Sequence, residues 1–196
     1  MTTISRIGGQ GSTTLPWLSA GMAMLAAGLW AAFGPAPPGL VFDRSAIAAG
    51  EIWRLVTGHF VHSNGRHALW DIVALAVIGT AMEERGRLQM LAGSATGIVA
   101  VDAWLWWFLP ELELYCGLSG MPNASFVLAL ADLWQTHRHP AFPIVALLLL
   151  AKLAAETSAG VSLVVTTAWP SLPQAHLAGC LGGLCLLFKD LPQTRR

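Results

Sequence analysis

Residues 141–157 read AFPIVALLLLAKLAAET, an almost unbroken apolar run that is nearly long enough to cross a bilayer. Its only ionisable side chains are Lys152 and Glu156, and both lie toward its C-terminal end. Because charge is costly inside a membrane, we expect Lys152 to extend its ammonium group toward the nearer membrane face. The run therefore predicts a membrane-spanning helix.

The composition of the whole chain supports this interpretation. Of its 196 residues, 55% are hydrophobic and 11% are charged, whereas soluble domains contain about a quarter charged residues. The net charge is zero, so no basic patch indicates nucleic acid as a partner. The three cysteines form no CxxC motif and no disulfide framework. These features are typical of an integral membrane protein in the lipid bilayer.

Outward from this run, the same pattern predicts an all-α, polytopic bundle of six transmembrane helices. A loop at 35–66, rich in Pro, Gly and Trp, is expected to lie at the membrane interface. We divide the chain into a disordered tail (1–16), a membrane domain (17–190) and a short C-terminal tail (191–196), and interpret the first apolar run as a retained span. The predicted spans are residues 17–34, 67–82, 88–109, 119–134, 141–157 and 174–189.

The distribution of Lys and Arg predicts that both termini are cytoplasmic. In that orientation seven basic residues lie inside, and the three outside, Arg44, Arg54 and Arg66, all belong to the long first loop. The second, fourth and sixth spans then run inward from the outer face. The polar residues near their starts should therefore share one depth; they are His67, Asp71, Ser119, Asn123 and His176.

Ser119 lies in the stretch Gly117-Leu118-Ser119-Gly120, where the fourth predicted span begins. The two glycines allow a tight turn and leave room above the hydroxyl. Free backbone amides at a helix start, with the positive end of the helix dipole, can stabilise an oxyanion. The pattern predicts a nucleophile, and the alternative is a serine that only caps its helix.

His176 opens the sixth predicted span and shares a helical face with Gly179 and Gly183. Small residues four positions apart let a neighbouring backbone approach closely. If that neighbour is the fourth span, His176 can act as general base to Ser119. The alternative is a histidine that binds a backbone carbonyl. No Asp or Glu stands clearly behind His176, so a Ser–His dyad is favoured over a triad.

Two other kinds of site were considered and are not favoured. His59, His62 and His67 suggest zinc, but their spacing is not HExxH and no carboxylate apart from Asp71 follows at helical spacing. We therefore do not favour a metal site. A thiol nucleophile at Cys116 is the other alternative, because Cys116 lies three residues before Ser119.

Five motifs lie between residues 51 and 183. They are Trp53-Arg54, His62 with His67 and Asp71, Gly79 with Glu83, Gly117-Leu118-Ser119-Gly120, and Ala175-His176 with Gly179 and Gly183. Together they resemble the rhomboid family of intramembrane serine proteases. The resemblance implies Ser119 as nucleophile, His176 as general base, and His67 beside the Ser119 amide at the oxyanion. It implies that Glu83 braces the inner end of the second span, and that no metal or cofactor is needed.

Two positions depart from the family pattern. Asp71 stands where the family usually has Asn, and an ionised carboxylate accepts hydrogen bonds but cannot donate one to an oxyanion. Asp71 is therefore expected to orient His67 or to remain protonated. Asn123 stands where bacterial members often have an aromatic residue, and it shares the helical face of Ser119.

The compact layout and the stretch TGHFVH at 57–62 are most similar to the rhombosortases, a bacterial subgroup. This similarity implies cleavage of exported, membrane-anchored proteins at a C-terminal Gly-Gly sorting tail. It also implies a bacterial inner-membrane location with the active site opening toward the periplasm. The alternative is an inactive rhomboid-like protein that binds membrane clients. A small transporter is disfavoured, because the inner halves of the second and sixth spans are almost wholly apolar.

Overall fold

The computed structural model describes residues 15–160, 169 and 172–190. This part of the chain contains six long helices, each within three residues of a predicted span at either end. The predicted tail at 191–196 lies outside the described residues, as does all of the tail at 1–16 except Leu15 and Pro16. The long helices are α1 (Trp17–Phe33), α4 (Gly65–Glu83), α5 (Arg87–Phe108), α6 (Gly120–His137), α7 (Ala141–Ala159) and α8 (Pro173–Asp190).

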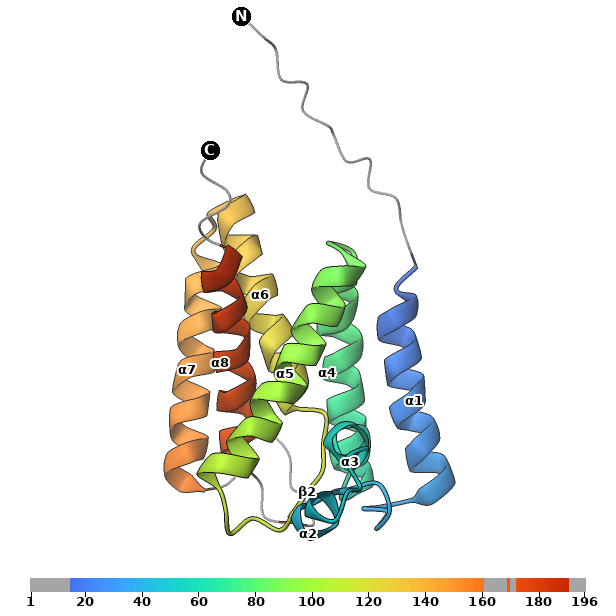
Figure 1. The fold of residues 1–196 in the computed structure, drawn as a ribbon. Helices are drawn as coiled ribbons and strands as arrows, with labels where there is room; N and C mark the ends of the chain where they lie inside the picture. Colours follow the sequence, from blue (N-terminus) through green and yellow to red (C-terminus); the bar gives the residue numbers. More distant parts are fainter. Residues whose placement is uncertain (1–14, 161–168, 170–171, 191–196) are drawn as a thin grey trace, which may run out of the picture.

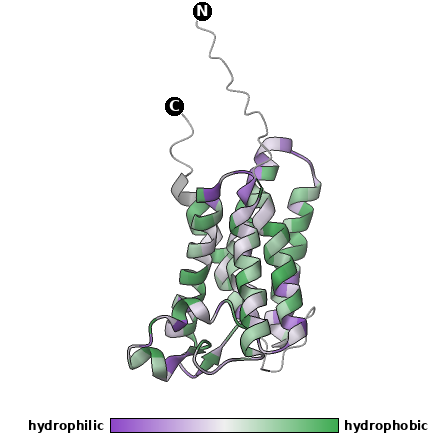
Figure 2. Cartoon of the chain, turned by 90° about the vertical axis from the view of Figure 1, so that its right-hand side faces the viewer, coloured by the Kyte–Doolittle hydropathy of each residue, from purple (hydrophilic) through white to green (hydrophobic). Residues whose placement is uncertain are grey.

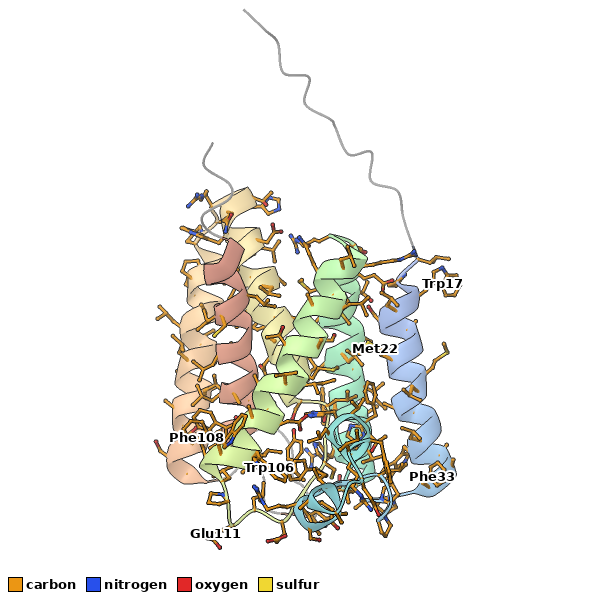
Figure 3. The ribbon with its side chains drawn as sticks, in the orientation of Figure 1. Trp17, Met22, Phe33, Trp106, Phe108 and Glu111 are labelled. Carbon is orange, nitrogen blue, oxygen red and sulfur yellow. The ribbon has the colours of Figure 1, made fainter. Side chains whose placement is uncertain are left out.

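Apolar side chains cover the outside of this bundle. Within the described residues, α5 and α7 are each long and apolar enough to cross a membrane, while α1 and α8 are shorter apolar helices. Hydrophobic residues follow the length of the long helices, and hydrophilic residues gather near their ends (Figure 2). Trp17 and Phe33 project from opposite ends of α1 (Figure 3), as residues at the two interfaces of a membrane do.

The long helices form two closely packed groups (Figure 1). Helices α5, α6 and α8 pack against one another, while α1 packs against α4. Helix α4 joins the groups through α5 and α6. The core between them contains buried apolar side chains from both groups, including Leu75, Met90, Leu118 and Met121. Helix α7 packs mainly against α6 and α8 at one side of the bundle.

The first loop contains short elements of secondary structure. It contains the short helices α2 (Arg44–Ala48) and α3 (Arg54–Thr57) and the strand β1 (Phe42–Asp43). Strand β1 pairs antiparallel with β2 (Leu114–Tyr115), with Phe42 opposite Tyr115. This pairing joins two loops that are distant in sequence and holds them together at one end of the bundle (Figure 1).

Arg54 and Trp53 fasten the start of this loop. The buried Arg54 side chain donates to the carbonyl oxygens of Pro38 at 2.6 Å and Val41 at 3.0 Å. It also pairs with Glu51 at 2.6 Å. The Trp53 indole donates to the Gly39 carbonyl at 3.3 Å. These bonds satisfy backbone carbonyls that no regular secondary structure pairs, which is why an irregular segment can be held in place.

At the opposite end of the bundle, Glu83 fastens α1 to α4. The N-terminus of α1 has no side-chain cap of its own. The Glu83 carboxylate, at the end of α4, accepts the backbone N–H groups of Leu18 at 3.0 Å and Ser19 at 2.8 Å, and the Ser19 hydroxyl at 2.8 Å. A carboxylate at this position satisfies free amides and favours the positive end of the helix dipole.

Candidate active site

Ser119 and His176 lie in contact, although 57 residues separate them in sequence. Ser119 immediately precedes α6, and His176 lies in the first turn of α8. The distance from Ser119 Oγ to His176 Nε2 is 2.9 Å, which is a hydrogen bond. The Ser119 hydroxyl makes no capping bond to its own helix. Its side chain therefore faces the imidazole instead of acting as the cap that the alternative interpretation required.

Close packing of α6 against α8 makes this contact possible. A Cβ atom at Gly179 would collide with the carbonyl oxygen of Gly120, and one at Gly183 would lie 2.6 Å from that of Ala124. Any larger side chain at these positions would hold the two helices apart. His176 and Gly179 are on one helical face, so the same approach that brings the backbones together brings the imidazole to Ser119.

Gly117 shapes the turn that leads to Ser119. Its φ angle is +131°, a conformation that residues with a side chain rarely adopt. A Cβ there would lie 2.7 Å from both Cε1 and Nε2 of His67 and 3.3 Å from Oδ2 of Asp71. The absence of a side chain at Gly117 thus lets α4 place His67 directly beside the chain that carries Ser119.

Asp71 lies at the centre of the polar contacts on the other side of Ser119. Its Oδ2 atom accepts the backbone N–H of Ser119 at 3.1 Å. The same oxygen lies 3.2 Å from His67 Nε2 and 3.4 Å from His62 Nε2. Ser63 Oγ lies 3.2 Å from the other ring nitrogen of His67. Asp71 thus contacts both groups, His67 and the Ser119 amide, that the sequence assigned to the oxyanion.

Asn123 contacts the serine from within α6. Its side-chain amide donates to the backbone carbonyl of Ser119 at 2.6 Å. Because Asn123 lies four residues after Ser119, this side-chain hydrogen bond spans the first turn of α6. Asn123 thereby restrains the backbone of the serine, and this bond does not involve the Ser119 hydroxyl.

Glu156 lies behind His176, a neighbour that the sequence did not single out. The Glu156 carboxylate on α7 is fully buried, and its Oε2 lies 3.3 Å from His176 Nδ1. The same oxygen accepts from Lys152 Nζ at 2.6 Å. The sequence signal that could have indicated Glu156 is its spacing from Lys152. The two residues lie four positions apart, on one face of a span in which charge is costly. The sequence did not show that α7 presents this face to α8.

The geometry gives little support to the three remaining candidates, which are His59, Cys116 and a metal centre. His59 is buried 3.1 Å from Asp102 on α5, apart from the histidines that contact Asp71. Within the described ranges, no group of three His, Cys, Asp or Glu side chains is arranged to hold a metal ion. Burial, together with the Asp71 charge, raises the pKa of the Cys116 thiol to about 12, which disfavours the thiolate that a nucleophile requires.

Residues 49–193 match the family model of the Rhomboid domain. The match covers most of the chain and includes Ser119, His176 and the residues that surround them. The chain belongs to the rhomboid family. No curated protein sequence matches it significantly. Rhomboids are membrane-embedded and are in general intramembrane serine proteases, which act on membrane proteins within the bilayer.

Family membership indicates the general class of this rhomboid, and the site geometry identifies the residues in contact. Membership supports a helical protein that lies in a membrane and acts on proteins there. The geometry adds which side chains of this chain lie in contact. Ser119 has a histidine at its hydroxyl, a carboxylate at its backbone N–H, and an amide at its carbonyl.

Proposed function

We propose that this rhomboid is a serine endopeptidase that cleaves membrane-anchored proteins near the outer face of a membrane. The observation that carries the proposal is the 2.9 Å contact between Ser119 Oγ and His176 Nε2. A serine hydroxyl is a weak nucleophile until a neighbouring base takes its proton. His176 forms a hydrogen bond with this hydroxyl and is therefore the proposed base.

The proposed reaction runs in two halves. As Ser119 Oγ attacks the scissile carbonyl carbon, its proton passes to His176 Nε2 and a tetrahedral intermediate forms. The C–N bond then breaks, and His176 returns the proton to the leaving amine. Water, activated by the same nitrogen, releases the acyl group from Ser119 and restores the enzyme. Transfer to a nucleophile other than water would follow the same steps.

Asp71 occupies the hydrogen-bond donors that the oxyanion would use. The Ser119 amide and His67 are the proposed donors to the developing negative charge. In the structure both contact Asp71 Oδ2. A substrate carbonyl oxygen that uses these donors therefore has to replace the carboxylate contacts. Asp71 in this role holds His67 in place before substrate binds, consistent with the expectation that it orients the histidine.

The proposed substrates are exported proteins with a C-terminal Gly-Gly sorting tail that consists of the glycine pair, an apolar helix and basic residues. Support comes from the similarity to rhombosortases and from the position of the site. Helices α6 and α8 both begin at the end of the bundle that carries the ordered first loop (Figure 1). We assign this end to the periplasmic side of a bacterial inner membrane.

The test is cleavage of a Gly-Gly-tailed substrate by the purified full chain in detergent or vesicles. We expect Ser119→Ala and His176→Ala each to lose activity by several orders of magnitude. The matched control is Ser125→Ala, which removes a buried hydroxyl from the same helix away from the site and should leave the rate nearly unchanged. Undiminished cleavage by either active-site variant contradicts the mechanism.

Two further measurements separate the alternatives. A fluorophosphonate probe should label the wild-type serine and fail to label Ser119→Ala. An absence of labelling, together with stable binding of intact substrate, favours the inactive client-binding protein. Replacement of the glycine pair in the substrate by leucines should abolish cleavage. If it does not, the enzyme is a protease of a different substrate class.

A further inference from the structure

His176 has a polar contact at each ring nitrogen. Nε2 faces Ser119 at 2.9 Å, and Nδ1 faces the Glu156 carboxylate at 3.3 Å. A neutral imidazole has one N–H donor and one acceptor nitrogen. If Nδ1 donates to the carboxylate, Nε2 carries the free electron pair that a general base needs. The two contacts together therefore select the tautomer that can deprotonate Ser119.

The surroundings of Glu156 suit this function. Its side chain is fully buried, and an isolated buried carboxylate would be strongly destabilised. Lys152 Nζ at 2.6 Å supplies the compensating charge, while about a third of the Lys152 side chain remains exposed. Lys152 thereby offsets part of the cost of burying this carboxylate, which lies within reach of the imidazole as an acceptor.

We propose that Glu156 is a positioning residue that completes a Ser119–His176–Glu156 relay across α6, α8 and α7. The inference rests on the proposed function. Glu156 holds the Nδ1–H tautomer and stabilises the imidazolium that forms when the Ser119 proton moves to Nε2. It receives no proton itself, because the hydrogen on Nδ1 stays on the ring through both halves of the reaction.

The competing explanation is that Glu156 only neutralises Lys152. The two explanations differ in what happens when both charges are removed. A pair that serves only to neutralise itself can be replaced by uncharged residues at little cost. A positioning residue cannot, because His176 then loses the anion behind it. The titratable groups on the other helices of the site and on α8 itself stay unchanged in this test. They are Asp71 and His67 on α4, Asp102 on α5, and Cys180, one turn after His176 on α8.

The first variant is Glu156→Gln, which keeps the shape of the side chain and an acceptor oxygen. We expect kcat to fall roughly 10- to 100-fold with little change in KM, a smaller loss than the ~10⁴-fold loss for the aspartate of a soluble triad. The acid limb of the pH–rate profile should move to lower pH, because the protonated imidazole has lost a nearby anion.

The second variant, Lys152→Met, should move the acid limb the other way. Without the ammonium group, the imidazolium of His176 takes over the neutralisation of the Glu156 carboxylate, so the inactive protonated form of His176 persists to higher pH. Opposite displacements by neighbouring substitutions on one helix would not result from general loosening of the fold. If both variants keep the wild-type profile, Glu156 does not act on His176.

The deciding variant is the double substitution Lys152→Met with Glu156→Gln. It leaves no unpaired buried charge, so it remains informative even if Glu156→Gln alone folds poorly. A double variant that stays at least tenfold slow, with its acid limb at lower pH, supports the relay. A double variant with wild-type kcat and profile overturns it.

Controls separate this inference from the proposed function. Ser158→Ala removes an exposed hydroxyl near the end of α7, bonded only within that helix, and should leave the rate unchanged. Glu83→Gln removes a buried carboxylate far from the site and should lower stability without moving the pH profile. If Ser119→Ala cleaves as well as wild type, the proposed function fails. If only the Glu156 variants match wild type, the function stands and the relay is wrong.

Discussion

Three backbone and side-chain contacts determine the chemistry available to Ser119. Its hydroxyl faces His176, its N–H faces Asp71 and its carbonyl accepts from Asn123. Two of these partners lie on other helices and the third lies four residues further along α6, so the residue cannot be understood from the GLSG motif alone. Gly117 is the position where this local geometry can be tested most cleanly.

Gly117→Ala should reduce both stability and activity. The added Cβ would be strained by the φ angle of +131° and would lie 2.7 Å from the His67 ring. We expect a loss of about 1–3 kcal/mol of unfolding free energy and at least a tenfold loss of cleavage rate. Thermal unfolding and cleavage rate measure the two effects. The control is Gly160→Ala, which also has a positive φ (+68°) but no atoms within 4 Å. Equal losses of activity in both variants would contradict the steric argument.

The polar contacts between helices of this rhomboid described above lie mainly at helix ends. The start of α6 carries the serine, the start of α8 carries the histidine, and the end of α4 caps the start of α1. At the starts of α6 and α1, a free backbone N–H meets a carboxylate from α4, which is Asp71 in the first case and Glu83 in the second. The Glu83 contact is the element-scale example farthest from the site.

Glu83→Ala should destabilise the bundle without altering the chemistry. It removes the acceptor for two backbone amides and one hydroxyl at the start of α1, for which we expect about 2–3 kcal/mol. Thermal unfolding should show the loss, while single-turnover cleavage at low temperature should stay near wild type. Glu84→Gln, at the exposed neighbouring carboxylate, is the matched control. A stability loss no larger than that control would contradict the cap.

At the scale of the whole molecule, the bundle has two chemically different ends. One end carries the ordered loop with α2, α3 and the β1–β2 pair, and the other carries the α4–α5 turn and the start of α1 (Figure 1). Glu111 marks the first end (Figure 3). Orientation in the membrane decides which compartment supplies substrate to Ser119 and His176.

The proposed orientation predicts opposite labelling of two exposed loops. In a chain whose three cysteines are replaced by alanine, Glu111→Cys should react with a membrane-impermeant maleimide added to intact spheroplasts. His139→Cys, between α6 and α7, should react only after the membrane is opened. Cleavage by the cysteine-free chain controls for folding. The reverse labelling pattern would place the active site toward the cytoplasm.

The sequence by itself determined the number and limits of the long helices, because the length of an apolar run is a local property. It also indicated Ser119 and His176, since Gly-rich stretches and polar residues at span starts are visible without coordinates. Gly179 and Gly183 predicted a close helix neighbour, and the Rhomboid match at residues 49–193 spans all of these motifs.

Only the tertiary structure decided which groups meet. Asp71 contacts the Ser119 amide across 48 residues, and Glu156 reaches His176 from a helix whose rotation the sequence did not specify. The order within the first loop depends on Arg54 and on pairing with β2, both long-range contacts. Periodicity shows which face of a helix is polar. The packing of neighbouring helices decides what that face touches. Here the packing of α7 against α8 adds Glu156 to the Ser119–His176 pair that the sequence predicted.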